Sequence, residues 1–261
     1  MTSGKQARRQ RQAAARPPVR STEGRRASPT VLLGALAGVL GIALVVVLVI
    51  VFTGGNSGGS GVTGTTLPDS DVIAQQFQGI PQQGNLLGKA SAPVTLIEYI
   101  DLQCPICRQF ETEVMPTVLQ RYVRTGKVRV EVRPIAFIGP DSERGRRGMI
   151  AAEQQNKGFN FAQILYFNQG PENGGWLDET MVADAAASVG LDPKAITSEL
   201  NSTAVADRTK VYDRQAQADA VSGTPTIFVG RAGAAKPTEV TPGRSPSVAE
   251  LSAVIDQALK G

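Results

Sequence analysis

Histidine is absent from this sequence, and cysteine occurs only twice, at Cys104 and Cys107. The absence of histidine excludes Ser-His-Asp and Cys-His catalytic sites, imidazole general bases and histidine-ligated metals. Two cysteines are too few for a multi-disulfide scaffold, or for a four-cysteine zinc site within one chain. Aromatic residues make up only 5%, yet a hydrophobic fraction of 41% in 261 residues excludes wholesale disorder and allows a sizeable core.

Acidic residues are nearly missing from the first 30 residues, which contain eight Lys or Arg and one acid, Glu23. The next segment, residues 31–52, has no charged residue and consists mainly of Val, Leu, Ile, Ala and Gly. A helix of this length spans about 33 Å, enough for a hydrocarbon core of about 30 Å. We therefore predict an uncleaved transmembrane helix over residues 31–52. A cleaved signal peptide and a buried soluble helix are the alternatives.

The basic N-terminal residues predict the orientation of this helix. By the positive-inside rule, residues 1–30 form a cytoplasmic tail and the C-terminal part of the chain is extracytoplasmic. We expect the tail to set topology and to touch anionic lipids, and we expect no nucleic-acid partner. Residues 53–66 are rich in Gly, Ser and Thr and predict a flexible linker, so the folded body comprises residues 67–261.

The body opens with a β-α-β pattern. Residues 94–100 are a nearly continuous apolar run, typical of a strand covered on both faces. A helical repeat of apolar residues follows the cysteines, and Pro116 within it predicts a kink. Residues 128–134 alternate apolar and charged side chains, as a half-exposed strand does. A strand, a helix and a second strand predict a right-handed crossover with parallel pairing.

The remainder of the body predicts a helical insert and a second group of strands. Helical signals dominate residues 141–221. A short strand is expected at residues 226–229 and another near residues 238–241, followed by a final helix that Ser247 caps. The predicted fold class is therefore a layered α/β domain.

The two cysteines directly follow a buried-type strand and occupy the first turn of a helix. The backbone amides and dipole at a helix N-terminus favour negative charge, so the pKa of the Cys104 thiol should fall and expose a nucleophilic thiolate. Cys107, one turn later, is placed to close a disulfide. Buried structural thiols, a static disulfide and metal binding by the CxxC pair are the alternatives, although two ligands do not complete a tetrahedral site.

Two segments of the body resemble the DsbA-like branch of the thioredoxin superfamily. The run GKASAPVTLIEYIDLQCPIC, residues 88–107, looks like the active-site region of that family. The run GTPTIFV, residues 223–229, is similar to its cis-proline loop and the strand that follows. The resemblance implies an α/β thioredoxin fold with an inserted helical subdomain, preceded here by a single N-terminal transmembrane helix.

The resemblance also implies roles for individual residues. Cys104 would be the attacking cysteine and Cys107 the resolving one. The peptide bond before Pro225 would be cis, and the backbone of Thr224 would pair with the substrate chain.

Three further residues are candidates for the site. We expect Pro105 and Ile106, between the cysteines, to contact the substrate. Ile106 departs from the strong oxidants of the family, which carry histidine there, so the thiolate should be less stabilised and the protein a weaker oxidant. Glu98 lies where the superfamily has a buried acid, and it is predicted to exchange a proton with Cys107. A carboxylate at the solvated end of the strand is the alternative for Glu98.

These features together predict a membrane-anchored, extracytoplasmic thiol:disulfide oxidoreductase. It would oxidise cysteine pairs of exported proteins through the Cys104–Cys107 disulfide, without a nucleotide or metal cofactor. The resemblance implies a quinone-linked membrane protein as its reoxidant. A disulfide reductase or isomerase with the same site, a copper or zinc carrier that uses both thiolates, and a non-catalytic adaptor are the alternatives.

Overall fold

The computed structural model describes residues 63–241 and 244–261. The predicted cytoplasmic tail and transmembrane helix, and the first part of the predicted linker, lie outside these residues. Within the two described ranges, no helix combines the length and the apolar character that a membrane crossing requires.

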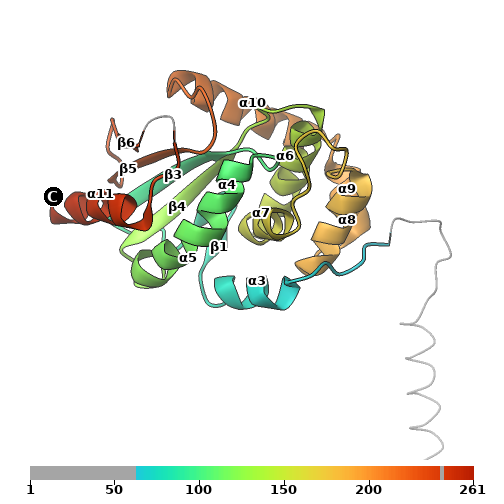
Figure 1. The fold of residues 1–261 in the computed structure, drawn as a ribbon, viewed down its shortest axis with the longest axis horizontal. Helices are drawn as coiled ribbons and strands as arrows, with labels where there is room; N and C mark the ends of the chain where they lie inside the picture. Colours follow the sequence, from blue (N-terminus) through green and yellow to red (C-terminus); the bar gives the residue numbers. More distant parts are fainter. Residues whose placement is uncertain (1–62, 242–243) are drawn as a thin grey trace, which may run out of the picture. The chain divides into compact units, whose positions relative to one another are not determined.

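A six-stranded mixed sheet forms the centre of the domain (Figure 1). Its strand order is β1-β2-β4-β3-β5-β6, and the strands comprise β1 Gln82–Gln83, β2 Leu86–Leu87, β3 Val94–Ile100, β4 Val128–Pro134, β5 Thr226–Arg231 and β6 Thr238–Val240. The pair β3 and β4 is parallel, with Val94 opposite Val128, and the other neighbouring pairs are antiparallel. The predicted strands at residues 94–100 and 128–134, and their parallel pairing, are confirmed.

One helical run follows the cysteines, and its hydrogen-bond pattern changes along its length. It comprises α4 (Pro105–Gln109), the π-helical turn η1 (Phe110–Val114), α5 (Met115–Val118) and the π-helical turn η2 (Leu119–Val123). Pro116 lacks an N–H group, and the helix type changes from π to α just before it, where the sequence predicts a kink. The apolar face predicted for this run comprises Ile106, Phe110, Val114, Val118 and Tyr122. The last four are buried in the core, whereas Ile106, in the first turn, is exposed to solvent, so the prediction was wrong for that residue.

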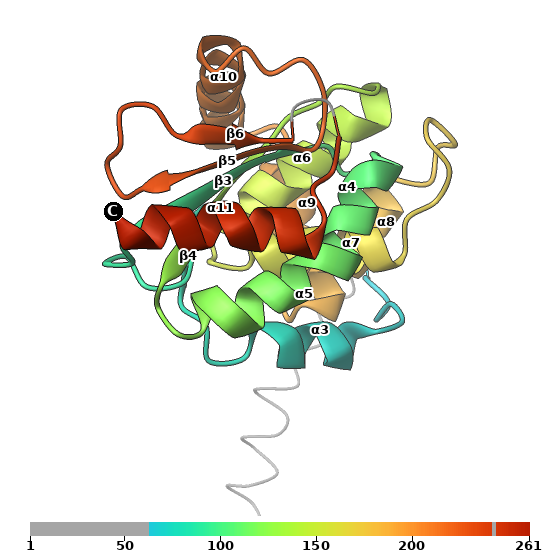
Figure 2. The same cartoon turned by 60° about the vertical axis from the view of Figure 1, so that its left-hand side comes forward.

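Five helices lie between β4 and β5, in the place of the predicted helical insert. They are α6 Pro140–Glu153, α7 Gly158–Phe167, α8 Glu179–Ser188, α9 Pro193–Glu199 and α10 Thr203–Ala218. Asp178, Asp192 and Ser202 cap α8, α9 and α10, because the side chain of each accepts a backbone N–H from the first turn. In Figures 1 and 2, α10 lies on the opposite face of the sheet from α4, α5 and α11 (Val248–Lys260).

Two elements near the start of the body are absent from the sequence-based prediction. These are α3 (Ser70–Phe77), which buries Ile73 and Phe77, and the short hairpin β1–β2. The end of the predicted linker lies against α8, because the backbone N–H of Thr65 donates to Asp184 at 2.6 Å. The Leu67 N–H similarly donates to the Ser188 hydroxyl at 2.8 Å. Near the C-terminus of the chain, Ser247 is the N-cap residue of α11 and forms a capping box, as predicted for the final helix.

A charged network joins the sheet to the C-terminal end of α10. Arg133 on β4 donates to Asp219 Oδ2 at 2.8 Å, and the Tyr99 hydroxyl of β3 donates to the same oxygen at 2.6 Å. Arg133 also pairs with Glu131 at 2.8 Å. Asp219 immediately follows α10 and stands five residues before Thr224, so this network fixes the point where the chain leaves the insert.

We expect Asp219→Ala to lower the free energy of unfolding by about 1–2 kcal/mol, because the buried Arg133 and Tyr99 side chains lose the partly exposed carboxylate that both of them contact. Asp207→Ala is a matched control: among the described residues Asp207 pairs with Lys210 alone, both side chains are exposed, and the substitution should cost less than about 0.5 kcal/mol. Urea unfolding of both variants measures the difference. Equal losses would show that the network does not hold α10 to the sheet.

Candidate active site

Cys104 is the N-cap residue of α4, at the point where β3 turns into the helical run. Its backbone is extended, and Pro105 occupies the first helical position, where the missing N–H costs little. The Cys107 N–H donates to Cys104 Sγ at 3.4 Å. The sequence places the sulfur there because an N-cap side chain points back toward the free amides of the first turn.

Cys107 lies one turn further along and is fully buried, whereas Cys104 is 6% exposed. Both are free thiols in this structure. Burial raises the pKa of the Cys107 thiol well above its ordinary value, and the hydrogen bond with Cys104 raises it further. Cys107 therefore remains a neutral thiol while its neighbour ionises.

The pKa of Cys104 is lowered from 9.0 to about 6. The hydrogen bond from the Cys107 thiol is the largest cause; burial opposes the shift, while the Thr224 side chain and the backbone amides of Cys107 and Ile106 support it. These donors favour the thiolate because each directs a partial positive charge at the sulfur. Near neutral pH the site thus holds one thiolate and one thiol.

The cis-proline loop lies beside the sulfur of Cys104. The Thr224–Pro225 peptide bond is cis, which confirms what the family resemblance implies. The carbonyl oxygen of Thr224 is 3.3 Å from Cys104 Sγ, within hydrogen-bond distance of the thiol. Two segments separated by 120 residues therefore meet at the sulfur of Cys104.

Glu98 lies inside the domain, 1% exposed, and not at the solvated end of its strand. Its neighbour is a second buried carboxyl group, Glu111, which the sequence analysis did not identify. Burial raises the pKa of both carboxyls, and the negative charge of Glu111 raises that of Glu98 further. One oxygen of each carboxyl has no hydrogen-bond partner among the described residues. A sequence signal for Glu111 exists, since it follows Cys107 by four residues and so shares its helix face.

Two large apolar side chains, one between the cysteines and one in the segment after β4, are open to solvent. Ile106 is 45% exposed and Phe137 is 57% exposed. Asp101 holds the Phe137 loop in place, because its Oδ2 accepts the backbone N–H groups of Phe137 and Ile138 at 2.7 and 2.9 Å. Pro105 is also exposed. The sequence analysis singled out Pro105 and Ile106 but missed Phe137, which lies in an irregular segment after β4.

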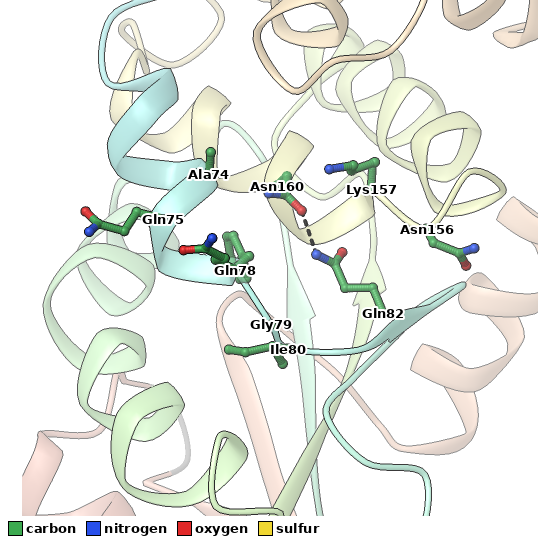
Figure 3. A pocket seen from close by; sticks show the side chains of 10 residues that line it. Ala74, Gln75, Gln78, Gly79, Ile80, Gln82, Asn156, Lys157 and Asn160 are labelled. Atoms are coloured by element: carbon green, nitrogen blue, oxygen red, sulfur yellow. Dashed lines mark hydrogen bonds between the residues drawn. The ribbon is translucent and has the colours of Figure 1, made fainter. Parts of the chain in front are cut away.

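No group of three or more Cys, Asp or Glu side chains suited to a metal ion occurs among residues 63–241 and 244–261. A polar hollow of about 570 Å³ lies elsewhere, between α3 and the beginning of α7 (Figure 3). Amide side chains line it, and Gln82 donates to Asn160 there at 2.6 Å. None of the candidate site residues lines this hollow.

We expect alkylation of Cys104 by iodoacetamide to follow a titration curve with its midpoint near pH 6, while Cys107 stays unmodified. Since the folded-state pKa lies below the unfolded one, the dithiol form gains stability as the pH rises from about 6 toward 9. That gain is lost as the pH falls through 6. Mass spectrometry identifies the modified cysteine, and thermal unfolding of the reduced protein follows the stability. A midpoint near pH 9 would contradict the described geometry.

Comparison with known proteins agrees with this geometry. A family model described as Thioredoxin matches residues 82–257. The probable disulfide bond formation protein D of Bacillus cereus is 29% identical over 147 residues, 55% of this chain and 68% of that protein. Disulfide bond formation protein D of Bacillus subtilis is 26% identical over 172 residues, 63% of this chain and 74% of that protein.

A solved structure shows the same fold. The crystal structure of oxidised BdbD from Bacillus subtilis superposes with a TM-score of 0.61 at 21% identity, covering 78% of this chain and all of that one. The parallel β3–β4 pair, the CxxC turn at the start of α4, the helical insert and the cis-proline loop are thus found together in one domain. This chain belongs to the thioredoxin family and is a DsbA-like thiol:disulfide oxidoreductase of that superfamily.

Proposed function

We propose that this protein is an oxidase of cysteine pairs in exported proteins, anchored in the membrane with its catalytic domain outside the cytoplasm. The observation that carries the proposal is the difference in pKa between the two thiols. Cys104, at the start of α4, is stabilised as a thiolate, whereas the fully buried Cys107 remains a neutral thiol. A stabilised thiolate favours the reduced form of the protein, and a protein with a stable reduced form gives its disulfide away readily. The names of the two Bacillus relatives support the same direction.

The reaction proceeds by two exchanges at sulfur. A substrate thiolate attacks Cys104 Sγ of the Cys104–Cys107 disulfide, which forms a mixed disulfide and releases the Cys107 thiolate. A proton then converts Cys107 to a thiol. A second substrate thiolate attacks the substrate sulfur of the mixed disulfide and expels the Cys104 thiolate. The substrate loses two electrons in forming its disulfide, and the protein gains them as a thiolate and a thiol.

The buried carboxyl pair is the proposed source of the proton for Cys107. Two like charges cannot both be carried in a dry interior, so Glu98 and Glu111 retain a proton near neutral pH. Glu111 lies on the same helix face as Cys107, one turn away. In the reverse exchange, the same pair accepts the Cys107 proton.

Substrate contacts surround Cys104. The backbone of Thr224 can pair with an extended substrate segment, since it lies beside the attacking sulfur at a 3.3 Å contact. The exposed Pro105, Ile106 and Phe137 offer apolar surface, which suits the side chains of an unfolded polypeptide. The Thr224 carbonyl would bind the backbone of the substrate, and the three apolar side chains would bind its hydrophobic residues. Such a surface selects unfolded polypeptides and not a particular amino-acid sequence.

The sequence supports the membrane anchor, and the family resemblance supports the reoxidant. Residues 31–52 form an uncharged stretch long enough to cross a bilayer, and eight basic residues precede it. A catalytic oxidant must be reoxidised, and a quinone-linked membrane protein is the proposed partner. Alkaline carbonate should leave the chain in the membrane fraction, and native membranes should reoxidise its thiols in a quinone-dependent way. Release by carbonate, or reoxidation without quinone, would exclude the corresponding part of the proposal.

We expect the oxidised full-length protein, purified in detergent, to form disulfides in reduced ribonuclease at pH 7. Cys104→Ser should abolish this transfer. Cys107→Ser should also lose this transfer, because it cannot form the donor disulfide; mixed in its reduced form with scrambled ribonuclease, it should trap a mixed disulfide at Cys104, because no Cys107 thiol remains to release the substrate. Loss of thiols and recovery of ribonuclease activity provide the readouts. Reduction of insulin by the dithiol form without any transfer to ribonuclease would favour a reductase, and stoichiometric copper binding without exchange would favour a carrier.

We expect Glu111→Gln to slow the resolution of a glutathione mixed disulfide by about tenfold, because Cys107 loses its proton acceptor. Quenched-flow trapping and mass spectrometry measure the lifetime of the intermediate. Glu113→Gln is the matched control, since Glu113 is exposed on the same helical run. Removing a carboxyl whose pKa is raised should not lower stability at pH 8. An unchanged lifetime in Glu111→Gln would remove the carboxyl pair from the mechanism.

A further inference from the structure

Gln103, the residue directly before the attacking cysteine, has a fully buried side chain with a partner at each end of its amide. Its Nε2 donates to the Ser142 hydroxyl of α6 at 3.0 Å and lies 3.4 Å from Asn173 Oδ1. Its Oε1 accepts the backbone N–H of Asn173 at 2.7 Å. These contacts tie the turn that carries Cys104 to two separate parts of the helical insert.

Gln169 holds the same turn through its backbone carbonyl groups. Its Nε2 donates to the carbonyl of Leu102 at 3.0 Å and to that of Cys104 at 3.3 Å. Gln169 belongs to the segment between α7 and α8, as Asn173 does. One loop of the insert therefore bonds the residues on both sides of Gln103.

This loop is itself fixed by close contact. A Cβ atom on Gly139 would collide with Asn173 Oδ1, so the turn before α6 and the α7–α8 loop approach each other more closely than a side chain would allow. Asp141 of α6 accepts the Gly175 N–H at 3.0 Å. The α7–α8 loop, which supplies the amide groups that hold the Cys104 turn, is thus itself fixed against the start of α6.

We propose that the helical insert sets the reactivity of Cys104 through Gln103 and Gln169, which act as positioning residues. The stabilising donors at the helix start reach Cys104 Sγ only if its backbone is held in the N-cap conformation, and the Cys107 N–H contact is already 3.4 Å long. Release of the Leu102 and Cys104 carbonyls lets the turn rotate and moves the sulfur away from these donors. The thiolate serves both directions of exchange, so this inference goes beyond the oxidase role and does not depend on it.

Gln169→Ala tests the proposal in the full-length reduced protein. The half-buried Gln169 side chain can be removed without opening the core, and we expect the alkylation midpoint of Cys104 to rise by about one pH unit, with about fivefold slower modification at pH 6. Gln103→Ala should raise it at least as far. If Gln103→Ala fails to fold, Gln169→Ala alone decides the question.

Gln82→Ala is the matched control. Gln82 is also half-buried and hydrogen-bonded through its amide, but it lies in the hollow between α3 and α7 (Figure 3). It should lower the melting temperature without moving the Cys104 midpoint. An unchanged midpoint in Gln169→Ala, or an equal shift in Gln82→Ala, would overturn the proposal, because the two glutamines would then contribute only to general stability.

Discussion

The hydrogen bonds that converge on Cys104 Sγ at the start of α4 are the interaction on which the rest of the site depends. The Cys107 thiol, the backbone amides of the first turn and the Thr224 side chain all favour the thiolate, and together they outweigh the cost of burial. The same arrangement leaves Cys107 in the core with a raised pKa. One short helical turn thus makes two chemically identical side chains unequal, and thiol:disulfide exchange at a defined sulfur follows from that inequality.

Three distant segments must meet for this turn to work. The sheet delivers Cys104 at the end of β3, and the antiparallel partner β5 brings the cis-proline loop beside it. The helical insert supplies the amides of Gln169 and the partners of Gln103. The network of Arg133, Tyr99 and Asp219 joins the last helix of the insert back to the sheet. The insert is therefore a structural part of the active site.

Local sequence patterns predicted much of this arrangement and none of its long-range amide contacts. Strand β3 is a nearly continuous apolar run and strand β4 alternates apolar and charged residues, so both strands were predictable. Helices α8, α9 and α11 were predictable because Asp or Ser occupies the N-cap position of each. Helix α3 is short and glutamine-rich, and its stability comes from packing of Ile73 and Phe77. Glu111 becomes chemically important only through burial beside Glu98, and the Gln169–Cys104 contact spans 65 residues, beyond any local pattern.

The reduction potential of the Cys104–Cys107 pair tests the central claim most directly. A thiolate with a pKa of about 6 at Cys104 stabilises the reduced form relative to an unperturbed dithiol. Equilibration of the full-length protein with thioredoxin of known potential gives the value. The account predicts a potential clearly more positive than about −270 mV, so that reduced thioredoxin transfers its electrons to this protein. A value at or below about −270 mV would contradict it, because the disulfide would then be too stable to be given to exported substrates.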